Sequence, residues 1–132
     1  MIYLDTNILV YAAIHKGKEG NTSRMLLRTF LEKDQTACTA ALTWDELVHS
    51  IWKKEGKTLA LEEGDKFFEL PNLTILRVDA EIIAKAQDLL KIYNLKPRDA
   101  IHAATAIINN CTEIVSDDPD FDKVKELKRR KI

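Results

Sequence analysis

Residues 1–14, MIYLDTNILVYAAI, decide the fold class and contain the first candidate functional residue. Ile2–Leu4 is a short apolar run typical of a strand, and the ILVYAAI that begins at Ile8 has the composition of a helix. Between them lie Asp5, Thr6 and Asn7, of which Thr6 or Asn7 is expected to cap the helix. The segment is predicted to run strand, turn, helix, with Asp5 at the carboxyl end of the strand.

The same alternation continues along the chain. Short apolar runs predict further strands at residues 37–39, 73–76 and 114–115 and from about residue 129. Residues 17–20 break the pattern, and helical spacing then predicts helices at 23–32, from Thr43, at about 58–70, from Asp79 and from Pro97, with a short one from about Phe121. Short strands alternating with amphipathic helices indicate an α/β fold, a three-layer α/β/α sandwich around a mainly parallel sheet of four to five strands.

Length and composition fit one soluble domain spanning residues 1–132. The chain has 132 residues, of which 45% are hydrophobic, and a formal net charge of −1. The opening residues do not resemble a secretory signal, and no apolar stretch is long enough to span a bilayer. Cys38 and Cys111 lie far apart in sequence, outside any zinc-binding spacing, which favours buried thiols. We expect a cytoplasmic protein without a membrane segment.

Acidic residues recur where the predicted strands end or the predicted helices begin. Because ligands of open parallel sheets bind beyond the carboxyl ends of the strands, these acids are expected on one rim. They are Asp5, Glu46, Asp99 and the cluster of Asp117, Asp118 and Asp120.

A shared cation would explain why so many carboxylates gather. Neighbouring carboxylates repel one another, and an all-oxygen ligand set without a histidine pair suits Mg²⁺ or Mn²⁺ better than zinc. Such an ion supports phosphodiester hydrolysis. Asn7 and Ser116 would then orient the carboxylates or a bound water.

Each acid also has a structural explanation. Thr43 and Glu46 match a capping box, in which Glu46 returns a hydrogen bond to the backbone of Thr43. Asp99 lies in a first helical turn, where acids are favoured by the helix dipole, and Asp118-Pro119 is a common turn former. These explanations leave open why four separate acids share one rim.

Two neighbouring residues are candidates for a role at this rim. Arg98 is a candidate phosphate contact because its planar fork suits that anion, and a surface ion pair is the alternative. His102 lies one helical turn after Asp99, and a packing or hydrogen-bonding role is favoured over a catalytic one.

Four local patterns give the chain a resemblance to PIN domains, and within them to the VapC toxins of bacterial and archaeal VapBC pairs. They are IYLDTNILVYA, ALTWDELVHS, LKPRDAIHAATAI and EIVSDDPDFDKV, and together they extend from Met1 to about Lys131. The first and third patterns are the specific ones.

The resemblance implies that Asp5, Glu46 and Asp99 are acidic metal ligands. The fourth acid of the family follows a Ser or Thr by two positions, which selects Asp118 after Ser116, with Asp117 and Asp120 as alternatives. Asp5, Asp99 and Asp118 are the principal metal ligands in this prediction. The resemblance also implies cleavage of single-stranded RNA with Mg²⁺ or Mn²⁺, often a homodimer, and inhibition by a small antitoxin.

Three other functions remain open from the residues alone. The chain could be an RNA-processing PIN nuclease outside a toxin pair. It could be a phosphatase with Asp5 as the nucleophile, although Asn7 occupies the position where such phosphatases need a second Asp. It could also be a non-catalytic module whose acids hold an ion or a basic peptide.

Overall fold

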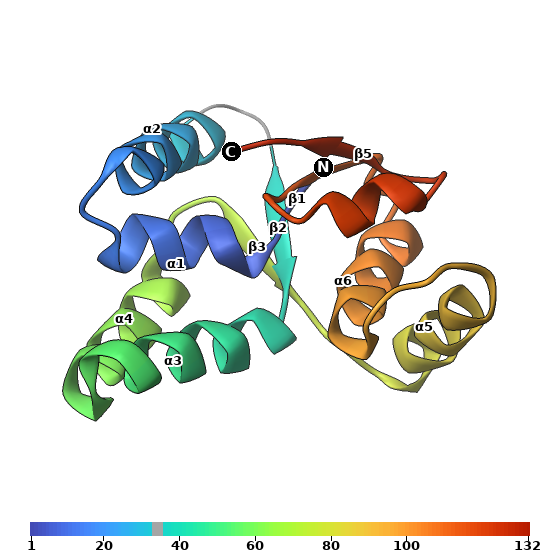
Figure 1. Ribbon diagram of the computed structural model, residues 1–132, viewed down its shortest axis with the longest axis horizontal. Helices are drawn as coiled ribbons and strands as arrows, with labels where there is room; N and C mark the ends of the chain where they lie inside the picture. Colours follow the sequence, from blue (N-terminus) through green and yellow to red (C-terminus); the bar gives the residue numbers. More distant parts are fainter. Residues whose placement is uncertain (33–35) are drawn as a thin grey trace.

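The computed structural model describes residues 1–32 and 36–132, which form five strands and six α-helices (Figure 1). The strands are β1 (Ile2–Leu4), β2 (Ala37–Ala40), β3 (Leu73–Leu76), β4 (Glu113–Val115) and β5 (Lys128–Arg130). The helices are α1 (Thr6–Ile14), α2 (Lys18–Glu32), α3 (Leu42–Glu55), α4 (Lys57–Glu69), α5 (Ala80–Ile92) and α6 (Pro97–Ile108), with a 3₁₀ helix η1 (Pro119–Lys123) before β5.

All five strands are parallel, in the order β3-β2-β1-β4-β5. The central strand is β1, where Tyr3 lies beside Cys38 of β2 and Ile114 of β4. The predicted α/β class and parallel sheet are confirmed. Since β1 and β4 are neighbours, the residues that follow them, Asp5 and Ser116, come together at one edge of the sheet.

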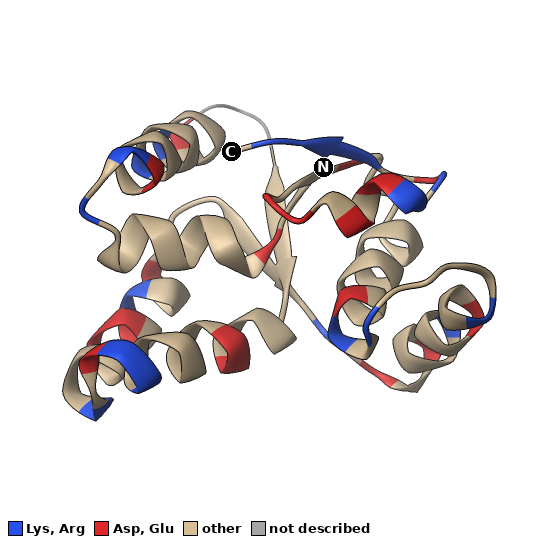
Figure 2. Ribbon diagram, in the orientation of Figure 1, with Lys and Arg blue, Asp and Glu red and all other residues tan. Residues whose placement is uncertain are grey.

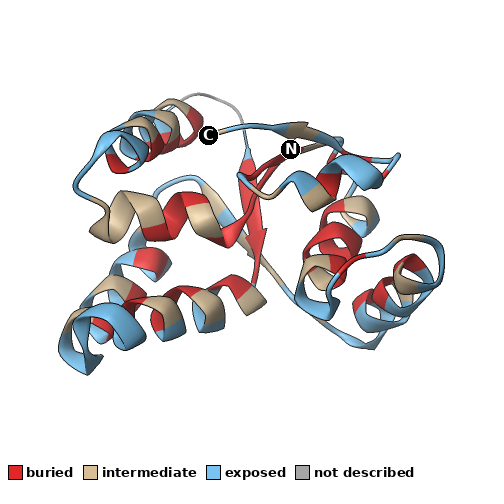
Figure 3. Cartoon of the chain, in the orientation of Figure 1, coloured by how far each residue is buried: buried red, intermediate tan, exposed pale blue. Residues whose placement is uncertain are grey.

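Alternating residues of the strands face two separate apolar layers, which confirms the three-layer arrangement. Tyr3 and Ile114 pack with α5 and α6, whereas Leu4 and Val115 pack with α1, α2, α3 and α4 on the opposite face. Figure 3 shows the buried residues concentrated on the strands and on the helix faces turned toward them. The longest helix, α2, has 15 residues, and none of the described helices combines the length and apolarity required to cross a membrane.

The start of α2 differs from the prediction. The helix begins at Lys18 and continues through Gly20, where the sequence suggested a break. A Cβ atom on Gly20 would lie 1.8 Å from the backbone oxygen of His15. The glycine is therefore required because the first turn of α2 passes against the end of α1, and it does not interrupt the helix.

Two predicted helix caps are wrong, and both errors concern functional candidates. Asp5 caps α1, where Thr6 or Asn7 was expected. α3 begins after Ala41 without a side-chain cap, and Thr43 lies buried, its hydroxyl 2.6 Å from that of Thr39 on β2. The capping box between Thr43 and Glu46 does not form, so the structural explanation of Glu46 no longer holds.

Candidate metal centre

The predicted acidic rim lies at the carboxyl ends of β1, β2 and β4. Asp5 directly follows β1, α3 begins two residues after β2, and Ser116 directly follows β4. The amino-terminal turn of α6 reaches the same edge, because α6 runs back along the sheet before β4. Figure 2 shows acidic segments at the entry to α1, on α3 and α6 and in the turn before η1 facing one another.

The four acids predicted from the sequence line one cleft of about 250 Å³. Its walls combine them with polar groups of α1 and α3: the lining residues are Asp5, Thr6, Asn7, Val10, Tyr11, Glu46, Ser50, Asp99 and Asp118. A second cleft of about 500 Å³ adjoins it and shares Glu46, Asp99 and Asp118. The acids are therefore within reach of a common ligand.

Asp5 is the most deeply buried of these acids, with 7% of its surface exposed. Its Oδ1 accepts a hydrogen bond of 2.8 Å from the Thr6 backbone N–H, and its Oδ2 accepts one of 2.6 Å from the Ser116 hydroxyl. Burial raises the pKa of Asp5 above its usual value, even though His102 and Ser116 act in the opposite direction. The carboxylate is held rigidly at an electrostatic cost that a cation would offset.

Asp99, Asp118 and Asp120 form the tightest acidic group among the described residues. One carboxylate oxygen from each lies within 4.8 Å of the others. Burial, followed by the charges of Asp118 and Asp5, raises the pKa of Asp99 to about 6. Asp5 and Glu46 also line the cleft but are not members of this group. The group therefore differs from the predicted metal ligands by having Asp120 in place of Asp5.

The three acids of the loop after β4 have different surroundings. The Asp118 backbone N–H donates to the Ser116 hydroxyl (3.0 Å), and Asp118 lines both clefts. Asp120 instead forms an ion pair of 2.9 Å with Lys123. Asp117 is exposed and accepts a 3.3 Å hydrogen bond from the Tyr11 hydroxyl. Of the three, Asp118 is the acid that lines the clefts without a cationic partner among the described residues.

Glu46 reaches into the cleft from α3 and contacts His102, for which the sequence favours a packing or hydrogen-bonding role. Its Oε1 accepts a hydrogen bond of 3.0 Å from the Thr6 hydroxyl and lies in close contact with His102 Nε2. His102 Nε2 also lies 3.7 Å from Asp5 Oδ1. The one sequence signal for His102 was its position one turn after Asp99, which places both side chains on the same side of α6.

The contact between Glu46 and His102 changes the pKa of each residue in the direction that favours its charged form. Burial raises the pKa of Glu46, but the hydrogen bond and charge of His102 outweigh it, so the pKa is lowered. Burial likewise lowers the pKa of His102, and Glu46 and Asp5 raise it above its usual value. Glu46 is consequently ionised at neutral pH and accepts a hydrogen bond from His102 Nε2–H.

The polar groups of the cleft fit an oxygen-ligated cation. Asn7 Nδ2 lies 3.4 Å from the Ser116 hydroxyl, the same hydroxyl that bonds Asp5 and the Asp118 backbone. Asn7 Oδ1 is buried without a hydrogen-bond partner in residues 1–32 and 36–132. A buried oxygen in this position, beside several carboxylates, suits a hard divalent ion or its bound water.

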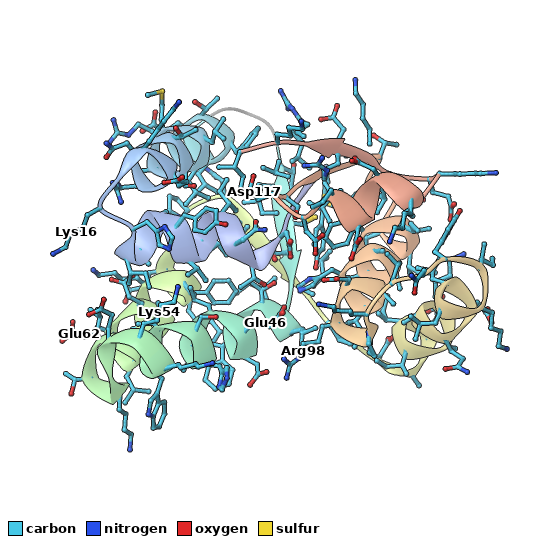
Figure 4. The ribbon with its side chains drawn as sticks, viewed as in Figure 1. Lys16, Glu46, Lys54, Glu62, Arg98 and Asp117 are labelled. Atoms are coloured by element: carbon cyan, nitrogen blue, oxygen red, sulfur yellow. The ribbon has the colours of Figure 1, made fainter. Side chains whose placement is uncertain are left out.

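Arg98 lies at the mouth of the second cleft together with Lys96, and both are exposed. Figure 4 shows Arg98 of α6 close to Glu46 of α3. The charge of Arg98 contributes to the lowered pKa of Glu46, after burial and the contacts with His102 and Thr6. In the described part of the chain, Arg98 forms no ion pair within 4.0 Å, so the surface ion pair considered from the sequence is not observed.

Neutralising Asp99 is expected to stabilise the ion-free protein. Because the pKa of Asp99 in the folded protein is about 6, above its usual 3.8, protonation favours folding. This contribution is complete below about pH 4 and is lost as the pH rises through about 6. Asp99→Asn should therefore raise the free energy of unfolding by about 1 kcal/mol at pH 7.5 in EDTA, after allowance for solvent screening, and by less at pH 4.5.

Urea unfolding at the two pH values measures this difference. Asp88→Asn, which changes an exposed acid 3.9 Å from Lys91, is the control and should show no such gain. Added Mn²⁺ should raise the midpoint of the wild-type protein more than that of Asp99→Asn. An equal response of both proteins to Mn²⁺ would argue against a cation at Asp99.

Comparisons with solved structures find the same fold in several toxin–antitoxin proteins. A chain of VapBC2 from Rickettsia felis, solved with a promoter DNA fragment, has a TM-score of 0.78 at 23% identity, covering 99% of this chain and 98% of that chain. VapC20 of Mycobacterium tuberculosis, described as a sarcin-ricin loop cleaving toxin, has a TM-score of 0.80 at 15% identity, covering 95% of each chain. FitAcB from Neisseria gonorrhoeae has a TM-score of 0.72 at 21% identity, covering 98% of this chain and 96% of that chain.

The sequence comparisons decide the family. No curated protein matches the sequence significantly. The profile of the PIN domain, however, matches residues 2–127, which is nearly the whole chain and includes every acid of the cleft. The chain therefore belongs to the PIN domain family.

Proposed function

We propose that the protein is a Mg²⁺- or Mn²⁺-dependent endoribonuclease that cleaves single-stranded RNA, and that it acts as the toxin of a type II toxin–antitoxin pair. The observation that carries the proposal is the meeting of Asp5, Glu46, Asp99 and Asp118, from four separate elements, in one cleft. Without a cation, repulsion among such carboxylates destabilises their ionised forms. Membership of the PIN family and the likeness to VapC toxins support a nuclease.

Asp5, Asp99 and Asp118 are the proposed metal ligands, and Glu46 completes the pocket. A bound divalent ion would activate water and offset the negative charge that develops on the phosphodiester. Ser116 holds Asp5 through its hydroxyl and accepts the Asp118 backbone N–H, so it positions two of the three ligands. Thr6 holds Glu46, and the free oxygen of Asn7 is placed to orient water at the site.

The proposed partner is a small antitoxin, as implied by the resemblance to VapC. The structural neighbours support it because several were solved as VapBC or FitAB complexes. A homodimer and a cytoplasmic location stay predictions of the sequence.

A cleavage assay on the purified protein tests the function. Mixed single-stranded RNA should give discrete fragments with Mg²⁺ or Mn²⁺, none in excess EDTA, and fragments again once Mn²⁺ is restored. DNA of the same sequence should remain intact. Ion binding without hydrolysis of RNA or DNA would favour the non-catalytic module, and a phosphorylated Asp5 would favour the phosphatase.

Arg98 is the proposed contact for a phosphate next to the scissile one, because it is exposed at the mouth of the second cleft and has no ion pair within residues 1–32 and 36–132. Arg98→Ala is expected to raise KM for RNA about threefold to tenfold, with kcat within about twofold, and to reduce the salt dependence of binding by about one charge. Arg98→Lys should be intermediate, since lysine keeps the charge and loses the fork.

The control for this prediction is Arg28→Ala, which removes a cation of α2 that lies 3.9 Å from Glu32. Initial rates over a range of RNA concentrations at two salt concentrations provide the measurement. A lower kcat with an unchanged KM would contradict the proposed role of Arg98 in binding the RNA.

A further inference from the structure

A chain of buried polar groups leads from β2 through β1 and α6 to the cleft. The Ala40 backbone N–H donates to the Tyr3 hydroxyl (3.1 Å), and this hydroxyl shares a hydrogen bond of 2.6 Å with His102 Nδ1. The other ring nitrogen of His102 contacts Glu46. Tyr3 is fully buried and His102 is 1% exposed, so neither can exchange these partners for solvent.

The direction of the last hydrogen bond is fixed by Glu46. An ionised carboxylate only accepts hydrogen bonds, so the Nε2 of His102 must be protonated and donates the hydrogen bond to Glu46. This holds whether or not Nδ1 is also protonated. Both ring nitrogens are occupied, and the ring also packs edge-on against Tyr3 with centroids 5.8 Å apart. A rotation of the imidazole would break both hydrogen bonds at once.

Glu46 needs such a constraint because it lines both clefts. Its long side chain would otherwise be free to turn toward the cation of Arg98 at the mouth of the second cleft. His102 and Thr6 both donate to Oε1, which leaves Oε2 outside these bonds and open to a ligand. A charge-assisted hydrogen bond from a buried, immobile donor is well suited to holding a carboxylate in one orientation.

We propose that His102, held in place by Tyr3, is a positioning residue that fixes the Glu46 carboxylate in the metal cleft. The proposal rests on the proposed metal-dependent cleavage for its kinetic consequences. It does not require His102 to exchange a proton with the substrate. A purely structural role predicts loss of stability without a specific effect on the cleft.

Two substitutions of His102 separate positioning from packing. His102→Leu fills similar space without a donor, and is expected to lower kcat and to weaken Mn²⁺ binding, each about tenfold, with KM for RNA within about twofold. His102→Gln offers an amide donor to Glu46 and should recover most of both losses. Thr105→Val, on the same helix, is the control. It removes a buried hydroxyl that donates to the Ile101 backbone oxygen, and it should leave kcat and Mn²⁺ binding unchanged.

The imidazole itself supplies a readout that needs neither metal nor RNA. In ¹H–¹⁵N spectra of the ion-free protein, the Nε2–H signal of His102 should be protected from exchange with solvent. Tyr3→Phe and Glu46→Gln should each shift this signal or remove its protection. Tyr93→Phe is the control and should do neither, because the Tyr93 hydroxyl bonds the exposed Glu126.

The outcomes divide cleanly. A protected signal, with weaker Mn²⁺ binding in His102→Leu and recovery in His102→Gln, supports the proposal. An unprotected signal, unchanged Mn²⁺ binding in His102→Leu, or equal damage in both variants would overturn it. If the wild-type protein cleaves no RNA, the proposed function fails, while the spectra and the Mn²⁺ titrations still decide the role of His102.

Discussion

Asp5→Asn is expected to abolish metal-dependent RNA cleavage, with a loss on the order of 10³-fold or more, while the fold is kept. Asp5 is the only one of the proposed ligands that is almost fully buried, and both of its oxygens have fixed donors. Asparagine retains an oxygen for the Thr6 backbone N–H and so still caps α1. It loses the negative charge that a cation requires and, with Nδ2 in place of Oδ2, the acceptor for the Ser116 hydroxyl.

The stability of the variant separates loss of function from loss of fold. Burial raises the pKa of Asp5, so the charged form disfavours the folded state of the ion-free protein at neutral pH. Asp5→Asn removes that charge and also the hydrogen bond from Ser116, so the two effects oppose each other, and it should unfold in EDTA at a midpoint close to that of the wild type. Cleavage rates and urea midpoints on the same preparation provide the measurement. Cleavage at the wild-type rate would count decisively against the proposed site.

The fold was predictable because its signals are local. Ile2–Leu4 followed by Asp5 marks the end of a buried strand, and Pro97 marks the first turn of α6 at the position where the structure has it. A parallel sheet then brings the ends of β1 and β4 together whatever the details of the helices. For this reason the sequence alone predicted that Asp5, Glu46, Asp99 and Asp118 would share a rim.

The finer contacts were not predictable because they depend on groups distant in sequence. Thr43 looked like a helix cap, but its hydroxyl is taken by Thr39, which in turn bonds the backbone oxygen of Leu4 on the neighbouring strand. Once Thr43 turns inward, Glu46 has no capping role and extends toward His102 of α6. No spacing in the sequence encodes that meeting of α3 with α6, so the sequence relates His102 only to residues of its own helix.

The choice among the three acids after β4 illustrates the same limit at shorter range. Ser116-Asp117-Asp118-Pro119-Asp120 offers three carboxylates within four residues, and their directions depend on the turn that precedes η1. In the structure the turn is closed by the Ser116 hydroxyl, which accepts the Asp118 backbone N–H. This bond carries Asp118 to the cleft, while Asp117 is directed to Tyr11 on α1.

Individual substitutions in this turn should therefore give graded losses. Asp118→Asn is expected to lower kcat about 10²-fold, because it removes a proposed ligand charge beside Asp99. Asp120→Asn should cost about threefold to tenfold, since Asp120 belongs to the tight acidic group but is already paired with Lys123. Asp117→Asn should remain within about twofold, because Asp117 is exposed and lines neither cleft.

The comparison is well matched, because each asparagine keeps one oxygen that can accept the hydrogen bond of the aspartate it replaces. Asp118 accepts the Asp120 backbone N–H at 2.9 Å, a bond that asparagine can also form, so the start of η1 should survive the change. Mn²⁺ affinities measured beside kcat should follow the same order, because the losses arise from ligand charge. If Asp120→Asn proved more damaging than Asp118→Asn in both measurements, the fourth ligand would be Asp120, and Lys123 would have to release it when the ion binds.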